Sequence, residues 1–506
     1  AQDLRDRNAL LPVHQLPVEV LADIFQETFD EDSGYFDSRL EQYKKLSHVC
    51  YRWQTVLDNS PGLWSRIDGK DPSALVDEAL KKSSNRLLNF SFCTQVTHEP
   101  HKLASFLQKL DPHLNRLRNV RINFQSDFLP KSHLTTVKLF TSPQPSLERL
   151  YLRDLLFQTD LSRLELFADH APRLKDLYLN GIAFNCRGAI FGRLNDLSLF
   201  NASIPSINAL LGSISCCGEL LNLQLNNIWV LGVGTDPPPG PISLPVLRSL
   251  SLGSMPLALE EGLLRDIQAP QSSCFALSLK GCPVDLEMLL LRYAPKWLLK
   301  RSPFPPEITK VDIEVTEFRL LLTFFHANDS ERSNLFLSHA QDVGTCCGVL
   351  RGVTAFLKSY VPKADIHLTL GCTAFHLAED GSYVEQLSCL SQTTVLRLGQ
   401  PWSSWQRNYW ESDGAQNFQL PAFPRLQNLS FHQQPSDWII KIVRMLSAHP
   451  ERECGSRCIA VAIYVWKDSE LDEMSSAAEK IKEIVGVERV VVSVSPESKK
   501  KGQNLG

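Results

Sequence analysis

Several features that mark common protein classes are missing from this sequence of 506 residues. No run reaches the roughly 18 consecutive apolar residues that a membrane-spanning helix needs, and no basic-then-apolar leader follows Ala1. Lys and Arg together number 52 against 56 Asp and Glu, a net charge of −4, whereas proteins that bind nucleic acid usually carry a basic face. We therefore expect neither a membrane nor a nucleic acid as a partner.

Catalytic motifs are missing as well. The sequence contains no GxxxxGK[ST], GxGxxG, HExxH or GxSxG. A zinc site usually needs four close ligands, and the nearest pattern is a loose group of three histidines without a cysteine pair: His98, His101 and His113. We expect no catalytic residues, no metal and no cofactor, and a hydrolase or metalloenzyme is only a remote alternative.

The cysteines do not indicate a disulfide framework. There are 13 of them, an odd number scattered through a long chain, with two adjacent pairs at Cys216–Cys217 and Cys346–Cys347. This usage is typical of reduced thiols inside the cell. We therefore expect the protein in the cytoplasm, the nucleus or both.

What the sequence does contain is one recurring phrase, L-x-x-L-x-L. Clear copies occupy 147–152, 174–179, 194–199, 220–225 and 247–252. Weaker copies centre on Phe90, Val120, Leu277, Val311, Leu335, Leu368, Leu396, Leu429, Val461 and Val490. The fifteen centres lie about 29 residues apart on average, and this phrase at such a period is the signature of leucine-rich repeats.

The pattern has a physical reading. Alternation places both leucines of L-x-L on one face of a strand, and intervening stretches such as 161–170, before Pro172, read as helices. Because one strand and one helix cannot bury their apolar faces alone, neighbouring repeats must stack. We predict an α/β fold with a solenoid over 68–495 that has one curved parallel sheet and helices on its convex side, followed by a disordered basic tail at 496–506.

The repeats depart from the regular type. Regular repeats carry Asn or Cys three residues after the last leucine, where the side chain bonds the backbone of the turn. Here this position is mostly apolar: Leu155, Ile182, Ala202, Ile228, Met255 and Cys282. Three stretches, 230–241, 301–306 and 401–421, also interrupt the pattern. We therefore expect an irregular array with uneven curvature.

The side chains between the leucines, and those in the flanking position directly after the last leucine, are the candidate substrate-binding residues. Solenoids bind partners on the concave strand surface, and aromatic and Arg residues dominate binding hot spots. The predicted set is Tyr151, Arg153, Tyr178, Asn180, Phe200, Gln224 and Asn226, with Trp402 and Trp405 from the 401–421 stretch. Two alternatives stay open: an ordinary solvated sheet face, since Tyr suits strands, and a loop that folds back to shield the repeat edge.

The first 67 residues differ from the repeats. Apolar residues fall at helical spacing from Leu16 to Phe25, with Pro17 at the helix start. A second helical pattern runs over 38–58, is broken near Val49 and is stopped by Pro61. A unit of this size buries too little surface to be stable alone. It must therefore pack against the rest of the chain, as a helical cap, or against another protein.

Three blocks of this segment carry a resemblance. They read L-P-x-E-V-L-x-x-I-F from position 16, V-C-x-x-W from 49 and S-P-x-L-W from 60. In this order they resemble an F-box, in the form common among basidiomycete fungal F-box proteins, over about a tenth of the chain. Departures from the family pattern are the longer acidic loop at 30–35 and Tyr51 in place of a basic residue.

The resemblance implies a function for the whole chain. In that family three helices at 1–67 dock on a Skp-type adaptor, which joins a cullin-based ubiquitin ligase. The implied adaptor surface is Leu16, Pro17, Val20, Leu21, Ile24, Val49, Cys50 and Trp53. The chain would then be a non-catalytic subunit that holds a protein substrate on its repeats. An interaction scaffold that binds the adaptor without serving a ligase is the alternative.

Trp64 is expected to join the N-terminal helices to the repeats by covering the open end of the solenoid.

Overall fold

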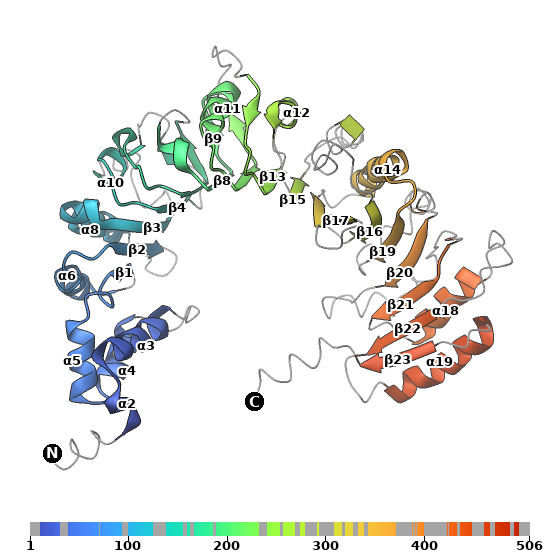
Figure 1. The fold of residues 1–506 in the computed structure, drawn as a ribbon, viewed down its shortest axis with the longest axis horizontal. Coiled ribbons are helices and arrows are strands. Elements are labelled where there is room, and N and C mark those ends of the chain that lie inside the picture. Colours follow the sequence, from blue (N-terminus) through green and yellow to red (C-terminus); the bar gives the residue numbers. More distant parts are fainter. Residues whose placement is uncertain are drawn as a thin grey trace. The chain divides into compact units, whose positions relative to one another are not determined.

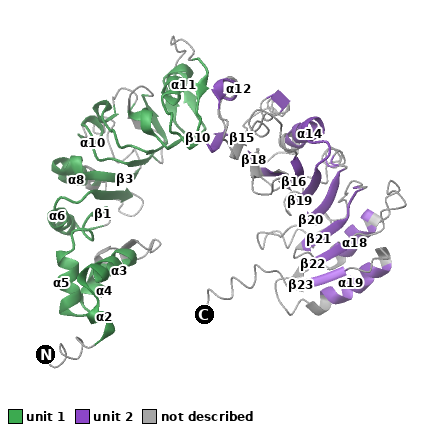
Figure 2. Cartoon of the chain, in the orientation of Figure 1, with its two compact units in different colours: residues 1–246 green, residues 247–506 purple. Residues whose placement is uncertain are grey.

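The computed structural model describes the chain in segments. They are residues 11–30, 39–69, 71–93, 100–124, 138–154, 159–161, 166–185, 189–231, 240–253, 257–268, 274–278, 291–292, 308–315, 319–326, 332–338, 343–370, 387, 390, 392–398, 423, 425–432, 436–447, 460–465, 471–485 and 490–494. The chain divides into two compact units, residues 1–246 and 247–506 (Figure 2). Both are mixed α/β units built on parallel strands, consistent with a leucine-rich-repeat-like fold.

The described part of unit 1 begins with the helices α2 (Pro12–Gln15), α3 (Val18–Asp30), α4 (Arg39–Ser47) and α5 (Tyr51–Asn59). The break predicted near Val49 lies between α4 and α5. Cys50 there has extended backbone, and its Sγ accepts the Trp53 amide at 3.5 Å, so it caps α5. Leu21 and Phe25 of α3 are buried. The helical spacing in the sequence predicted α3, α4 and α5, and it missed α2.

The seven strands that follow form a parallel ladder in chain order (Figure 1). They are β1 (Arg66–Asp68), β2 (Leu88–Cys93), β3 (Leu117–Phe124), β4 (Arg149–Asp154), β6 (Asp176–Asn180), β8 (Asp196–Phe200) and β10 (Asn222–Asn226). The register aligns Leu150, Leu177, Leu197 and Leu223, all of them buried. The L-x-L alternation thus buries one face of the sheet, as predicted.

The buried face of this ladder is covered by helices and by a second, smaller sheet. The helical elements are α6 (Ser73–Lys82), α8 (Pro100–Leu110), η1 (Asp111–Arg116), α10 (Lys138–Thr141), η3 (Leu166–Asp169), η4 (Ala189–Arg193) and α11 (Ile207–Ser215). The small parallel sheet contains β5 (Thr159–Leu161), β7 (Ile182–Phe184), β9 (Ser203–Ile204) and β11 (Trp229–Val230). Unit 1 also includes β12 (Ile242–Ser243).

The helix predicted over 161–170 is wrong. Leu161 ends β5, and the described remainder of the stretch is the short η3. Phe167 and Ala168 have φ of 59° and 46°, a left-handed conformation that an α-helix cannot contain. Burial of both Leu166 and Phe167 favours this tight turn over a continuous helix. The expectation of helices alone on this side of the sheet is therefore also corrected.

Unit 2 is also built on parallel strands, with one antiparallel strand among the described ones. Its strands are β13 (Ser249–Gly253), β15 (Cys274–Ser278), β16 (Ile308–Val315), β17 (Arg319–His326), β18 (Arg332–Ser338), β19 (Asp365–Leu370), β20 (Thr393–Leu398), β21 (Asn428–His432), β22 (Ala460–Val465) and β23 (Val490–Val494), with the short β14 (Ile267–Gln268). Its helices are α12 (Leu257–Asp266), α14 (Val343–Tyr360), α18 (Ser436–Ser447) and α19 (Leu471–Val485). All fifteen predicted strand centres of the chain lie in strands.

The antiparallel strand is β17, which the repeat pattern missed. It pairs antiparallel with both β16 and β18, so that β18 lies beside β15 and β16 beside β19. Leu320, Leu322 and Phe324 of β17 are buried. The expectation of a purely parallel sheet is therefore wrong here, because the short connections at 316–318 and 327–331 are long enough only for hairpins.

Trp64 lies between α5 and β1. Its side chain is 3% exposed, and its Nε1 donates to the Leu57 carbonyl at 2.7 Å. The Tyr43 ring of α4 lies 5.3 Å away, centroid to centroid, and Lys82 Nζ of α6 lies 4.3 Å from the indole centre. The expected burial of Trp64 is confirmed, and its contacts join α4 and α5 to the helix that covers the first strands.

Candidate functional site

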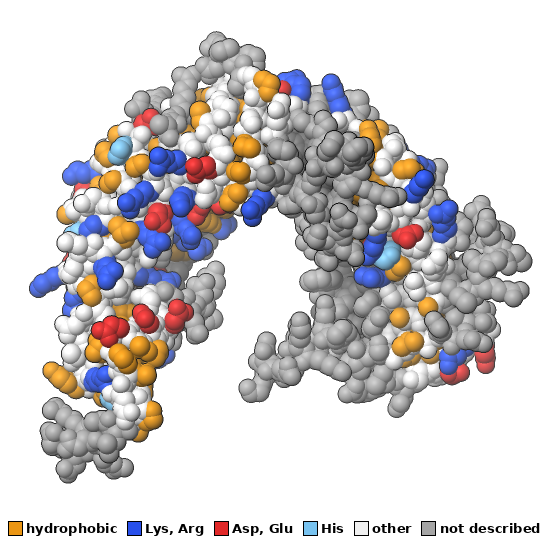
Figure 3. Space-filling model, viewed as in Figure 1, with side chains coloured by type: hydrophobic (Ala, Val, Ile, Leu, Met, Phe, Trp, Pro, Cys, Tyr) orange, Lys and Arg blue, Asp and Glu red, His pale blue; other side chains and the backbone are white. Residues whose placement is uncertain are grey.

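Exposed apolar side chains gather on the N-terminal helices. Six of the ten large hydrophobic residues that are exposed among the described residues belong to this segment: Leu11, Val18, Val20, Ile24, Val49 and Tyr51. We call these six the N-terminal apolar patch. Figure 3 shows hydrophobic side chains over α3 and its neighbours. Apolar area concentrated in this way is typical of an interaction surface.

Two sequence blocks separated by about 30 residues meet at this patch. His14 Nε2 lies 3.7 Å from Cys50 Sγ, and Arg52 donates a hydrogen bond to the Leu16 carbonyl. The Phe25 and Trp53 rings lie 4.9 Å apart at an angle of 58°. These contacts hold the start of α3 against the α4–α5 turn, so that Val20, Ile24 and Val49 belong to one small helical unit.

The eight predicted adaptor residues differ in exposure. Pro17, Val20, Ile24 and Val49 are exposed, with 41%, 45% and 54% for the last three. Leu16, Cys50 and Trp53 are partly covered, and the Trp53 Nε1 has no hydrogen-bond partner in the described structure. Leu21 is 0% exposed. It therefore stabilises the helices and offers no surface to a partner. Val18 and Tyr51, which sequence reasoning did not include, add exposed apolar area.

An acidic row borders the patch on α3. Glu19, Asp23 and Glu27 recur every four residues and are all exposed. Side chains at this spacing lie on one face of a helix, next to the face of Val20 and Ile24. A partner of the patch would thus meet apolar side chains flanked by negative charge.

The second candidate surface is the face of the unit 1 sheet opposite the leucines. Tyr151 of β4 and Tyr178 of β6 stack with centroids 4.0 Å apart and planes at 6°. Phe200 of β8 continues the stack at 5.4 Å and 30°. The Arg121 guanidinium of β3 covers the other end, 4.8 Å from the Tyr151 centre. We call these four residues the aromatic row.

Three members of the aromatic row are placed by the strand register, whereas Phe200 pairs with Asn180 and lies diagonal to Tyr178. Arg121, Tyr151 and Tyr178 are paired neighbours on successive strands. Because neighbouring strands lie about 4.8 Å apart, the rings of Tyr151 and Tyr178 at paired positions stack face to face. Burial, and then a hydrogen bond with Tyr178, raises the pKa of the Tyr151 hydroxyl. The Tyr151 hydroxyl is therefore a neutral hydrogen-bond donor at physiological pH.

Charged residues on one side of the row are already paired. Arg149 of β4 forms an ion pair with Asp176 of β6 at 2.8 Å, and Asn222 donates to Asp196 of β8. Burial raises the pKa of the Asp176 carboxyl, and nearby Asp196 adds to the rise, against the lowering effect of Arg149. On this flank the Arg149 charge is neutralised by Asp176, and Asp196 is held by a hydrogen bond from the neutral Asn222.

An asparagine ladder supports the other flank. Asn201 donates to Asn180 at 3.0 Å and Asn227 donates to Asn201 at 2.6 Å, while Asn180 donates to the Tyr178 hydroxyl at 3.1 Å. Asn201 and Asn227 have φ of 48° and 55°. They turn the chain one position before the apolar residues Ala202 and Ile228. Sequence reasoning missed this ladder because it looked for Asn at those apolar positions.

The structure brings most of the predicted substrate-binding residues together. Tyr151, Tyr178 and Phe200 form the row, and Arg153 is exposed beside it. Gln224 accepts from Ser198 at 3.5 Å. The remaining members lie as follows: Asn180 is nearly buried and positions Tyr178, Asn226 is partly exposed on β10, and Trp402 and Trp405 lie outside the described residues.

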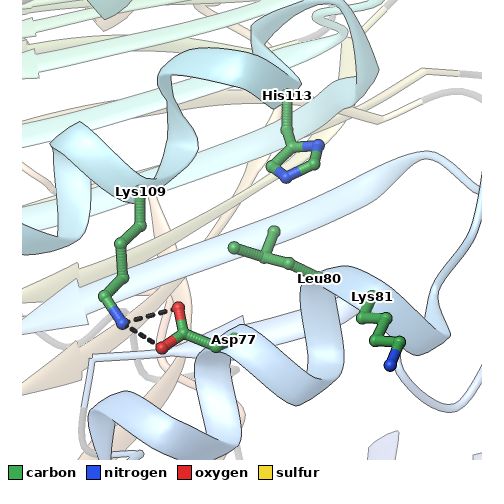
Figure 4. A pocket seen from close by; sticks show the side chains of 5 residues that line it. All are labelled: Asp77, Leu80, Lys81, Lys109 and His113. Carbon is green, nitrogen blue, oxygen red and sulfur yellow. Dashed lines mark hydrogen bonds and ion pairs between the residues drawn. The ribbon is translucent and has the colours of Figure 1, made fainter.

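A shallow pocket of about 310 Å³ lies on the helical side of unit 1, between α6 and the α8–η1 segment (Figure 4). Lys109 Nζ, however, forms an ion pair with Asp77 at 2.5 Å and also bonds Ser73. Burial and then the nearby Arg116 lower the pKa of His113. The pocket's charges are mostly satisfied internally, so it does not present a convergent catalytic group.

Metal-binding clusters, membrane-spanning helices and reactive cysteines would be further signs of function in the described residues. Among them, no three His, Cys, Asp or Glu side chains lie close enough to hold a metal ion, and no helix is long and apolar enough to cross a membrane. Cys216 is exposed, whereas burial raises the pKa of the Cys217 thiol to about 12. A thiol with this pKa is almost entirely protonated and unreactive.

Comparisons with known proteins add little. No family model matches the chain, and no curated protein matches it. A solved leucine-rich-repeat protein of Leptospira interrogans is similar over 85% of this chain and 90% of its own, at 12% identity and a TM-score of 0.23. A score this low supports no argument.

Proposed function

We propose that the chain is a non-catalytic interaction protein, in which the N-terminal helices bind a Skp-type adaptor and the repeats bind a protein substrate. On this proposal the adaptor connects the chain to a cullin-based ubiquitin ligase. The observation that carries it is the N-terminal apolar patch, which combines the F-box-like sequence blocks with exposed Val20, Ile24 and Val49.

The chemistry of such a subunit is proximity. Holding a substrate next to a reactive centre converts an encounter between separate molecules into a reaction within one complex, a gain that needs no catalytic side chain in the receptor. The open sheet face of unit 1, with stacked aromatic rings and exposed arginines, is the kind of surface that binds protein. This fits a receptor with two separate surfaces.

The test is an affinity purification of the full chain with a purified Skp-type adaptor. The variant Val20→Asp/Ile24→Asp places two charges in the proposed contact, where each desolvated carboxylate opposes binding strongly. Because both residues are exposed, the variant should fold. Substituting Leu21 would instead damage the helical core. A matched control is Ser105→Asp, which adds a charge at an exposed position of α8.

We expect the double variant to lose adaptor binding while the control keeps it. Adaptor binding by neither parent nor control would refute the assignment, as would equal binding by parent and double variant. If the adaptor is retained but cullin never co-purifies with the complex, the alternative of a scaffold without a ligase role is favoured.

A further inference from the structure

Arg121, at one end of the aromatic row, and Arg153, beside the row on β4, carry charges that no carboxylate among the described residues neutralises. Arg121 and Arg153 are exposed, and neither has an ion-pair partner among the described residues, in contrast to Arg149 with Asp176 and Arg118 with Glu148. Figure 3 shows Lys and Arg side chains concentrated over the part of unit 1 that holds β2 to β4. Unpaired guanidinium groups next to rings favour an anionic ligand.

The two arginines are close enough to share one ligand. Arg121 pairs with Tyr151, and Arg153 lies two residues beyond Tyr151 on the same face. Strand spacing and rise per residue place their Cα atoms roughly 8 Å apart. Guanidinium groups on long side chains can converge from that separation on a single carboxylate or phosphate, which they bind with planar, charge-assisted hydrogen bonds.

The rings themselves favour an anion over a stacked base. Tyr151 is covered on one face by Tyr178 and on the other by Arg121, so neither face of that ring is open. What remains for a ligand is the ring edges and the hydroxyls. Ring edges carry the positive part of the aromatic quadrupole, and the hydroxyls can donate hydrogen bonds. Nucleic-acid platforms, in contrast, present open ring faces.

We propose that the aromatic row together with Arg153 binds an acidic segment of a partner protein, with an anionic side chain between Arg121 and Arg153 and an apolar side chain against Phe200. This rests on the proposed function, in which this face of the sheet holds the protein substrate. Of the acidic residues on the same face, Asp176 is neutralised by Arg149, whereas Asp196 is hydrogen-bonded to the neutral Asn222 and keeps its charge. Arg121 and Arg153 together outweigh this one carboxylate. The row spans β3 to β8, roughly 15 Å, which about five extended residues cover.

The test measures binding of fluorescein-labelled peptides of about ten residues to the full chain, without an adaptor, by fluorescence anisotropy. One peptide alternates Glu with Leu and Phe. The second has phosphoserine in place of Glu, the third has Gln in place of Glu, and the fourth probe is an oligouridylate of similar length. The first two probes distinguish a carboxylate from a phosphate as the anionic group.

The matched variants differ in charge pairing. Arg121→Gln/Arg153→Gln removes the two unpaired charges, whereas Arg149→Gln/Asp176→Asn removes a paired couple on the same face and leaves the net charge unchanged. We expect the first variant to weaken binding of the Glu or phosphoserine peptide by about tenfold or more, as for lost charge-assisted contacts, and the second to change it less than about threefold. Binding should also weaken as salt rises.

Several results would overturn the proposal. They are the absence of binding by both anionic peptides, equal binding of the Gln peptide, equal loss in the two variants, or tighter binding of the oligouridylate than of either peptide. Preference for the phosphoserine peptide supports the site with phosphate as its anion. Because no adaptor is present, failure of this site leaves adaptor binding by the N-terminal apolar patch unaffected.

Discussion

At the scale of single residues, Trp64 connects three helices of unit 1. Its indole touches groups from three helices, Tyr43, Leu57 and Lys82, and it has almost no exposed surface. Around it, Lys82 Nζ bonds Asp58 at 2.7 Å and the Tyr43 hydroxyl donates to the same carboxylate at 2.9 Å. The joint between the helices and the first repeat is therefore a buried ring closed by a polar cluster.

Trp64→Ala should lower the free energy of unfolding of unit 1 by about 3–5 kcal/mol, because it leaves a cavity and removes a buried hydrogen bond. Hydrogen–deuterium exchange should show loss of protection in α4, α5 and α6. The control is Trp229→Ala, a residue that is 48% exposed, which should cost much less. Equal protection in the parent and Trp64→Ala would show that the indole is not a joint.

Tyr43 provides a pH-dependent probe of the same cluster. Burial, and then the hydrogen bond to Asp58, raises the pKa of Tyr43 to about 12 from 10.0. Since the folded state holds this proton more tightly than the unfolded state, the stabilisation is complete below pH 10 and is lost as pH rises through 12. Absorbance titration should show a tyrosine that ionises late, and Tyr43→Phe should remove it. If the difference between the parent and Tyr43→Phe titrations shows a tyrosine that ionises near pH 10, the assignment is contradicted.

At the scale of elements, the turns of unit 1 are held by side chains as well as by strand pairing. Asn180, Asn201 and Asn227 bond one another across β6, β8 and β10, and the backbone amide of Gly181, with φ of 74°, donates to Phe200 at 2.9 Å. Gly and Asn tolerate the left-handed conformation that these turns require. The ladder fixes the turn positions and, through Asn180, the Tyr178 hydroxyl.

Asn201→Ala should cost about 2–3 kcal/mol, since it removes two hydrogen bonds and places Ala at a φ of 48°. Asn201→Gly loses the same bonds without the backbone strain and should be milder by about 1 kcal/mol. Thermal unfolding of both variants measures the difference. If Gly and Ala are equally destabilising, the left-handed conformation is not what selects Asn at this position.

At the scale of the whole molecule, each unit stacks similar strands, but the two proposed interaction surfaces of unit 1 occupy different elements. The N-terminal apolar patch belongs to the segment from Leu11 to Tyr51, whereas the aromatic row belongs to β3, β4, β6 and β8. The joint at Trp64 and strands β1 and β2 separate them along the chain. The surfaces should therefore bind independently.

Cross-testing the variants checks this independence. Val20→Asp/Ile24→Asp should leave the affinity for the Glu peptide within about twofold, and Arg121→Gln/Arg153→Gln should leave adaptor binding equally unchanged, because distant, unshared sites are additive. Isothermal titration of each variant with each ligand measures both effects. A loss of peptide affinity in the N-terminal variant would mean that the two surfaces are coupled.

The local sequence pattern was sufficient to predict the strands, the faces of their side chains and several helix ends. The L-x-L alternation specifies a buried strand face, and all fifteen predicted centres lie in strands, because side-chain direction in a strand depends only on position along it. Tyr151, Tyr178 and Phe200 could be placed on the opposite face for the same reason. The start of α3 likewise followed from Pro17, and the two ends of α5 followed from Cys50 and Pro61.

What depends on residues distant in sequence was decided only by the tertiary structure. The order β15, β18, β17, β16 and β19 arises from pairing between strands, and no local pattern records which edge a strand will join. The burial of Leu21 beside exposed Val20 and Ile24 depends on how α3 packs on α5. Within the described residues Arg149 has an ion-pair partner and Arg153 has none, although the two arginines look alike in the sequence. They differ because only Arg149 has a carboxylate opposite it on the next strand.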